Sequence, residues 1–93
     1  MAFSYWQFAG NPILVVSSPV NNLVMTQDSV EVVGKTDPGA KLLINNEPVS
    51  ILENGSFDVK VPLSPGINTL TIVASNKFGK QTTLVRNLRL ESN

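Results

Sequence analysis

The stretch from Phe57 to Leu63 alternates between apolar and polar side chains more regularly than any other part of the chain. Every second position is apolar, and these positions share one face: Phe57, Val59, Val61 and Leu63. Asp58 and Lys60 lie between them and share the opposite face. A period of two residues is typical of a half-buried β-strand. Pro62 cannot donate a ladder hydrogen bond, so we expect it at the end of this strand or on a sheet edge.

The same period recurs in shorter form elsewhere. Leu70, Ile72 and Ala74 share one face of a second segment, and Val30 with Val32 shares one face of a third. The segment from Ile13 to Val16 is apolar on both faces and predicts a first strand. No window has a convincing 3.6-residue period. The pattern therefore predicts strands in six segments, which are 13–16, 30–35, 42–44, 57–63, 67–76 and 84–90.

Turn-forming residues separate these segments at short intervals. Glycine and asparagine tolerate positive φ, and proline presets φ at the second position of a turn. The turns are expected at Asp37-Pro38-Gly39, Asn45-Asn46, Asn54-Gly55, Ser64-Pro65-Gly66 and Phe78-Gly79. Short strands with turns every 8–12 residues or so predict an all-β sandwich or small barrel.

Two features depart from a clean alternation. Arg86 falls on the same face as Leu84 and Leu88, which predicts a bulge or an edge position in the last strand. Three apolar residues fall on outward faces, and we expect them to form an apolar docking strip if they cluster: Val33, Leu43 and Val73.

Composition narrows the function classes. The chain has 93 residues, no histidine and no cysteine, and seven basic residues balance seven acidic ones. The absence of cysteine excludes disulfides and thiolate chemistry. The absence of histidine excludes catalysis by a histidine base and metal sites with histidine ligands. A net charge of zero argues against nucleic acid as a partner. No catalytic motif is present, so we predict a protein that is not an enzyme and holds no cofactor. A calcium site built from Asp28, Asp37 and a loop carbonyl is a minor alternative.

The N-terminal segment is unlike the rest of the chain. Four of the six aromatic residues lie within its first eight positions, and the first charged residue is Asp28. The segment lacks the length of a membrane span and the pattern of a signal peptide. We predict an aromatic extension over residues 1–12 and a domain over residues 13–93. The predicted assembly or membrane-interface residues are Phe3, Tyr5, Trp6, Phe8, Ile13, Leu14, Val15 and Val16.

Three interpretations of this segment stay open. The aromatic residues could form a belt at a membrane interface, where Trp and Tyr are favoured. They could pack on a neighbouring copy or add a strand to its sheet, which would build a homopolymer. They could instead fold back over their own domain.

The turn and strand residues together resemble the bacterial immunoglobulin-like modules of the glucodextranase domain B type. The resemblance covers about residues 13–90 and rests on an ordered set: Gly34-x-Thr36-Asp37-Pro38-Gly39-Ala40, Asn45-Asn46, Asn54-Gly55-Ser56-Phe57, Leu63-x-x-Gly66-x-Asn68 and Ala74-x-Asn76-x-x-Gly79-Lys80. It implies an immunoglobulin-like sandwich of about seven antiparallel strands, export from the cytoplasm, and no catalytic residues. One departure is Asn45-Asn46, where the family usually has Asn-Gly.

The sequence thus predicts a non-catalytic extracellular or cell-surface module that serves as a spacer, adhesion or assembly unit. Its expected partners are neighbouring domains of a surface protein or further copies in a homo-oligomer or polymer. The alternative is a subunit of a self-assembling filament joined through the N-terminal segment. A carbohydrate-binding module is the weaker alternative, because Phe57 is expected to be buried and Phe78 is the other aromatic residue of the domain.

Overall fold

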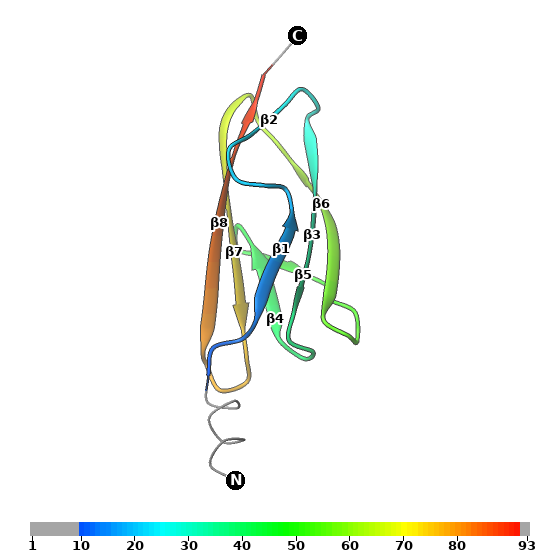
Figure 1. The fold of residues 1–93 in the computed structure, drawn as a ribbon, viewed down its shortest axis with the longest axis vertical. Coiled ribbons are helices and arrows are strands. Elements are labelled where there is room, and N and C mark those ends of the chain that lie inside the picture. The colour runs from blue at the N-terminus through cyan, green and yellow to red at the C-terminus, as the bar shows by residue number, and fades with distance from the viewer. Residues whose placement is uncertain (1–9, 92–93) are drawn as a thin grey trace.

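The computed structural model describes residues 10–91, which fold as two β-sheets packed face to face (Figure 1). The first sheet has the order β1-β3-β6 and the second has the order β2-β8-β7-β4-β5. The strands are β1 (Leu14–Ser18), β2 (Leu23–Met25), β3 (Ser29–Thr36), β4 (Lys41–Ile44), β5 (Glu47–Val49), β6 (Ser56–Pro62), β7 (Gly66–Ser75) and β8 (Gln81–Leu90). The predicted all-β sandwich is confirmed.

The strand count and pairing differ from the expectation in two respects. Within residues 10–91 there are eight strands, against about seven expected. The strands β2 and β5 were not predicted, and β2 pairs with β8 in parallel. Each of these two strands has three residues, and β5 carries Pro48 at its centre. Segments this short have no readable period, so pairing defines them rather than their own sequence: β2 pairs with the distant β8, and β5 pairs with β4 across the Asn45-Asn46 turn.

The core lies between the sheets and is built from the predicted inward positions. Leu70, Ile72 and Ala74 of β7 are almost completely buried. Because a strand exposes alternate residues to opposite faces, burial of these positions places Thr69, Thr71 and Val73 on the outer face. The buried apolar cluster comprises Val16, Val30, Val32, Leu42, Ile44, Phe57, Leu63, Leu70, Ile72, Ala74 and Leu88.

Arg86 occupies an edge position, which is one of its two predicted explanations. The register of β7 and β8 runs without interruption from Gly66↔Leu90 to Ser75↔Gln81, so β8 contains no bulge against β7. Along the other margin of β8, β2 pairs only with residues 88–90. The irregularity lies instead in β1, where the register with β3 shifts between Val16 and Ser18.

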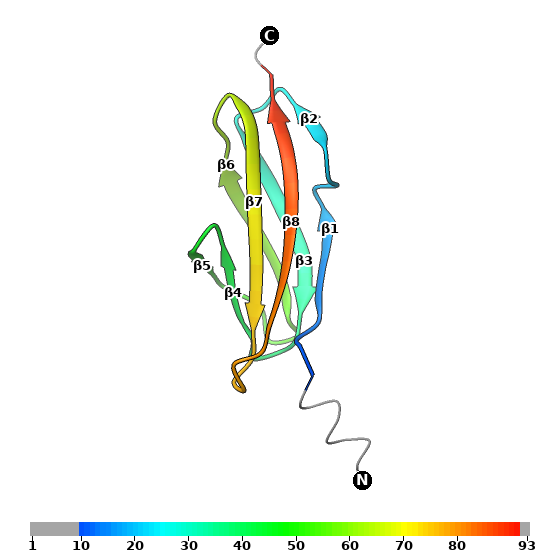
Figure 2. The same cartoon turned by 90° about the vertical axis from the view of Figure 1, so that its left-hand side faces the viewer.

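The side chain of Arg86 explains why a cation is tolerated on the inner face. Its Nε donates to the Pro19 carbonyl at 3.2 Å, and its Nη2 donates to the Val16 carbonyl at 3.4 Å. These carbonyls belong to the stretch where the chain leaves the first sheet and crosses to the second. Arg86 thereby ties β8 to that crossing (Figure 2 shows β8 beside β1).

The turns take the predicted conformations. Gly39, Gly55, Gly66 and Gly79 all have positive φ, and so do both residues of the Asn45-Asn46 hairpin. Two positive φ values in succession are what a type I′ hairpin requires, and this hairpin therefore tolerates asparagine where the family usually has glycine. Asn45 also accepts a hydrogen bond from the Thr71 amide at 2.9 Å.

Candidate docking surfaces

The start of the described chain is held on one end of the sandwich by hydrogen bonds. Asn76 donates to the Gly10 carbonyl at 3.2 Å, and Thr82 donates to the Pro12 carbonyl at 2.5 Å. The Ile13 amide donates to Asp37 at 3.2 Å. Residues 10–13 are therefore fixed to two loops, the β3–β4 loop and the β7–β8 hairpin.

The predicted assembly residues divide into three groups. Phe3, Tyr5, Trp6 and Phe8 lie outside the described residues. Ile13 and Val15 are exposed, at 61% and 53% of their surface, whereas Leu14 is half-buried and Val16 belongs to the core. The backbone from residue 14 to 18 pairs with β3 of its own sheet.

The predicted docking strip is divided between the sheets. Leu43 and Val73 are cross-strand partners on β4 and β7 of the second sheet. Val33 lies on β3 of the first sheet, opposite Asp58. All three side chains are half-buried. The structure brings together two of the three residues and separates the third.

The outer face of the first sheet is charged, whereas the outer face of the second sheet exposes apolar side chains near its β2 edge. The first sheet carries four charged side chains of alternating sign: Glu31, Lys35, Asp58 and Lys60. On the second sheet, Ile67 is 71% exposed and Val24 is 55% exposed, and both lie beside Arg89. The docking prediction missed these two apolar residues. The two-residue alternation of β7 could have identified Ile67 as an outward-facing residue, since Ile67 shares the face of Thr69 and Val73.

Two carboxylates meet on the charged face. A hydrogen bond with Asp58 and the negative charge of that residue raise the pKa of Glu31 above its ordinary value, while Lys60 opposes the shift. Both acids are exposed on a flat sheet. Within residues 10–91, no group of three or more acidic side chains is placed to hold a metal ion.

The calcium alternative built from Asp28 and Asp37 is wrong. Asp28 precedes β3 and Asp37 follows it, so an eight-residue strand separates the two carboxylates. At about 3.3 Å per residue, that strand spans roughly 26 Å, and one ion cannot bridge the two ends.

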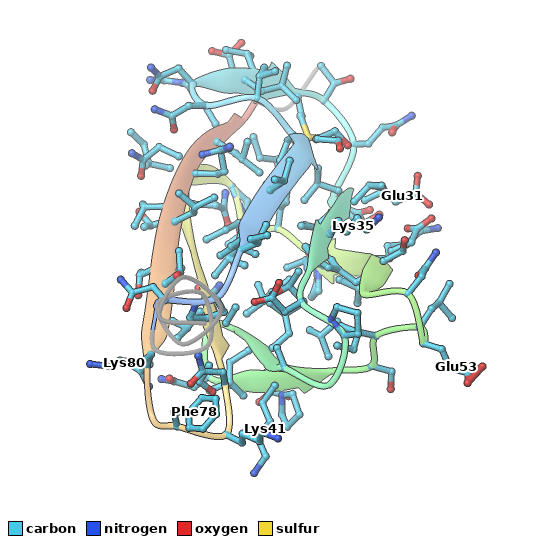
Figure 3. The ribbon with its side chains drawn as sticks, turned by 60° about the horizontal axis from the view of Figure 1, so that its bottom comes forward. Glu31, Lys35, Lys41, Glu53, Phe78 and Lys80 are labelled. Atoms are coloured by element: carbon cyan, nitrogen blue, oxygen red, sulfur yellow. The ribbon has the colours of Figure 1, made fainter. Side chains whose placement is uncertain are left out.

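A hollow of about 440 Å³ lies at the end of the sandwich where residue 10 is held. Its walls come from the β3–β4 loop and the β7–β8 hairpin: Gly10, Asp37, Pro38, Gly39, Ala40, Asn76, Lys77 and Phe78. Phe78 is 56% exposed, and the Lys77 ammonium lies 5.6 Å from the centre of its ring. Figure 3 shows Phe78 at this end, with Lys41 and Lys80 to its sides.

Two polar side chains that line this hollow, Asn76 and Asp37, make hydrogen bonds within the domain. The side-chain Oδ1 of Asn76 accepts from the backbone amides of Phe78 and Lys80, each at 3.0 Å. The Asn76 amide binds Gly10, and Asp37 binds the Ile13 amide. Beside these two side chains, the hollow presents the Phe78 ring, neighbouring apolar surface and the Lys77 cation.

The fold and the motif positions agree with the comparisons to known proteins. Residues 12–91 match the model of the family described as glucodextranase, domain B. This chain belongs to the glucodextranase domain B family. An 80-residue stretch of an amylopullulanase from Thermoanaerobacter thermohydrosulfuricus is 34% identical and covers 85% of the chain. The chain spans about 5% of the length of that enzyme.

The domain B fold is shared with modules of low sequence similarity. The fibronectin(III)-like modules of CbhA from Clostridium thermocellum align with a TM-score of 0.64 at 10% identity. The alignment covers 86% of this chain and 98% of the module. At this identity the likeness establishes the fold alone.

The motif residues of domain B have structural roles in this chain. Asn68 uses its amide to hold the β6–β7 turn, since it accepts from the Ser64 amide and donates to the carbonyls of Ser64 and Gly66. Thr36 is buried, and its hydroxyl donates to the Ile13 carbonyl at 2.6 Å. Gly55 packs its α-carbon against the Thr36 backbone.

Proposed function

We propose that this chain is a non-catalytic spacer module of a secreted or cell-surface protein whose other domains act on polysaccharides. The family match over residues 12–91 and the amylopullulanase relative support this proposal. The single observation that carries it is that an 80-residue match accounts for only 5% of that enzyme, which is the relation of an accessory module to a long multidomain chain.

The geometry suits a spacer. The described chain begins, in blue, at one end of the sandwich and finishes, in red, at the other (Figure 1). β7 and β8 have ten residues each, which corresponds to a span of about 33 Å. A chain that enters at one end and leaves at the other separates its two neighbours by the length of the domain.

Both ends of the described chain are fixed to the sandwich, which would set the direction of the flanking segments. At the entry, where residues 10–13 join the sandwich, Asn76 and Thr82 donate hydrogen bonds to the backbone and Asp37 accepts one from the Ile13 amide. At the exit, the Glu91 amide donates to the Met25 carbonyl at 2.8 Å, and Arg89 contacts the Glu91 carboxylate at 3.1 Å. Such anchoring supports a module that transmits orientation as well as distance.

The arrangement of acids supports a non-catalytic role. Glycoside hydrolysis uses two carboxyl groups that flank the bond to be cleaved. Glu31 and Asp58 are neighbouring exposed side chains on the outer face of the first sheet rather than facing each other across a cleft. Asp37 borders the hollow, but its carboxylate is engaged with the Ile13 amide.

Carbohydrate binding is the second candidate, because Phe78 is exposed beside the hollow at the entry end. Sugar recognition combines stacking on aromatic rings with well-placed polar groups. The polar atoms of Asn76 and Asp37 are used within the domain, which weighs against this candidate.

Affinity electrophoresis of the full chain distinguishes the candidates. Native gels with and without soluble starch, pullulan or dextran should give equal mobilities, for both the original chain and Phe78→Ala. Incubation with the same polysaccharides should release no reducing sugar. Retardation that Phe78→Ala abolishes would establish a carbohydrate-binding module instead, and release of reducing sugar would refute the non-catalytic role.

A further inference from the structure

The hollow at the entry end exposes apolar surface that the described residues leave uncovered. Phe78 projects from the β7–β8 hairpin with more than half of its surface exposed, and Pro38 is exposed on the opposite loop. A volume of about 440 Å³ lies between them. Ligand pockets in proteins range from roughly 300 to 1,000 Å³, so this space can receive a large side chain.

The position of Gly10 determines which chain segment comes nearest to this surface. Gly10 is itself one of the residues that line the hollow, and its carbonyl is bound by Asn76 from the opposite wall. Whatever precedes Gly10 therefore begins at the rim of the hollow.

The segment that precedes Gly10 has a suitable composition. It carries four aromatic side chains and no charge: Phe3, Tyr5, Trp6 and Phe8. An extended chain covers at most about 3.6 Å per residue. Phe8, two residues from Gly10, can reach about 7 Å, and Trp6 can reach about 14 Å, so both can contact the walls of the hollow.

We propose that the aromatic N-terminal segment docks into the hollow of its own domain, with Trp6 packed against Phe78 and Lys77. An aromatic ring prefers an edge-to-face or offset contact with a second ring, and an ammonium group favours the face of tryptophan. Phe78 supplies the ring, and Lys77 supplies the cation within 6 Å of it. Lys41 and Lys80 lie to the sides of Phe78 (Figure 3), and the segment has no charged side chain that would pair with them.

The segment is covalently joined to its own domain at Gly10. This tether favours docking within the same molecule over docking on a second copy. A segment attached at the rim of its site experiences an effective concentration in the millimolar range for a short linker, which exceeds the concentration of free protein in ordinary solutions. The contact would cover the end of the sandwich and fix the junction with whatever precedes the segment. The inference stands independently of the proposed function, because its test uses this chain alone.

Trp6 is the single tryptophan of the chain, so its fluorescence reports directly on the segment. In the full chain we expect an emission maximum shifted to shorter wavelength, and slower acrylamide quenching, than in a peptide of residues 1–9. Phe78→Ala should return both readings toward those of the peptide. The matched control is Ile67→Ala, which removes an apolar side chain that is more exposed than Phe78 and lies near the exit end, and which should leave both readings unchanged.

Three results would overturn the proposal. Emission of the full chain equal to that of the peptide would show that Trp6 is not packed. Shielding that survives Phe78→Ala would place the segment on another surface, and shielding that disappears on dilution would show docking on a second copy. Circular dichroism and thermal unfolding establish that Phe78→Ala remains folded. As a second readout, Trp6→Ala should shift the amide NMR signals of Ala40 and Phe78.

Discussion

Gly34 and Phe57 face each other across β3 and β6, and the ring of Phe57 lies where a side chain at position 34 would extend. A β-carbon on Gly34 would be 2.6 Å from the Phe57 ring and 2.1 Å from the Val15 carbonyl oxygen. The close approach of β1 and the burial of the largest core ring therefore depend on one missing side chain.

Gly34→Ala should strongly destabilise the domain. Inserting one methyl group into a packed core costs about 1–3 kcal/mol, and the contact with a backbone oxygen cannot be relieved by rotating a side chain. Chemical denaturation monitored by circular dichroism measures the loss. Gly39→Ala is the control, because its β-carbon would meet nothing within 4 Å and only its positive φ, at about 1–2 kcal/mol, opposes it. Equal losses in the two variants would contradict this explanation.

Replacing Arg86 by methionine should cost about 1.5–3 kcal/mol, the usual range for a hydrogen bond to a charged group. The loss arises because the carbonyls of Val16 and Pro19 lose their donor at the crossing between the sheets. Arg89→Met is the matched control. Its ion pair with Glu91 is exposed on both sides and should contribute about 0–1 kcal/mol. If the two substitutions are equally mild, Arg86 does not hold the crossing.

Asn46→Gly should stabilise the β4–β5 hairpin by up to about 1 kcal/mol, because glycine adopts positive φ without the penalty of a β-carbon. Asn45→Gly should give less, or should destabilise, since it removes the acceptor of the Thr71 amide. Thermal unfolding of both variants tests this difference, and a greater gain for Asn45→Gly would contradict it.

Asp58→Asn should stabilise the domain at neutral pH, and its advantage should shrink in acid. The folded state raises the pKa of Glu31 through its contact with Asp58, so the folded protein binds a proton at a higher pH than the unfolded chain. Lowering the pH through that raised pKa therefore relieves the repulsion and stabilises the original domain. Paired urea titrations from pH 7 to acid measure the difference. If the stabilisation by Asp58→Asn grew as the pH fell, this explanation would be contradicted.

Much of the fold could be predicted because β-strands of a sandwich have one buried face. The alternation in β6 and β7 identified Phe57, Leu70 and Ile72 as core residues, and turn chemistry placed the hairpins. The strands β2 and β5 were missed because each exists through pairing with a partner rather than through its own pattern.

The candidate surfaces were harder to predict than the core. Alternation shows that a residue faces outward but not which sheet it belongs to, so Val33 was grouped with Leu43 and Val73 although they lie on different sheets. The hollow beside Phe78 depends on two loops that are about 40 residues apart in sequence, and no local pattern brings them together.

The measurement that tests the spacer function most directly is the distance between the two ends of the domain when other domains flank it. The chain has no cysteine, so Asn11→Cys and Glu91→Cys give two unique positions for spin labels in the full chain fused between two carrier domains. Pulsed electron paramagnetic resonance should give one narrow distance distribution, on the order of 35 Å, that is the same with and without the carriers. A broad distribution, or one that changes with the carriers, would contradict the account of this module as a spacer of fixed length.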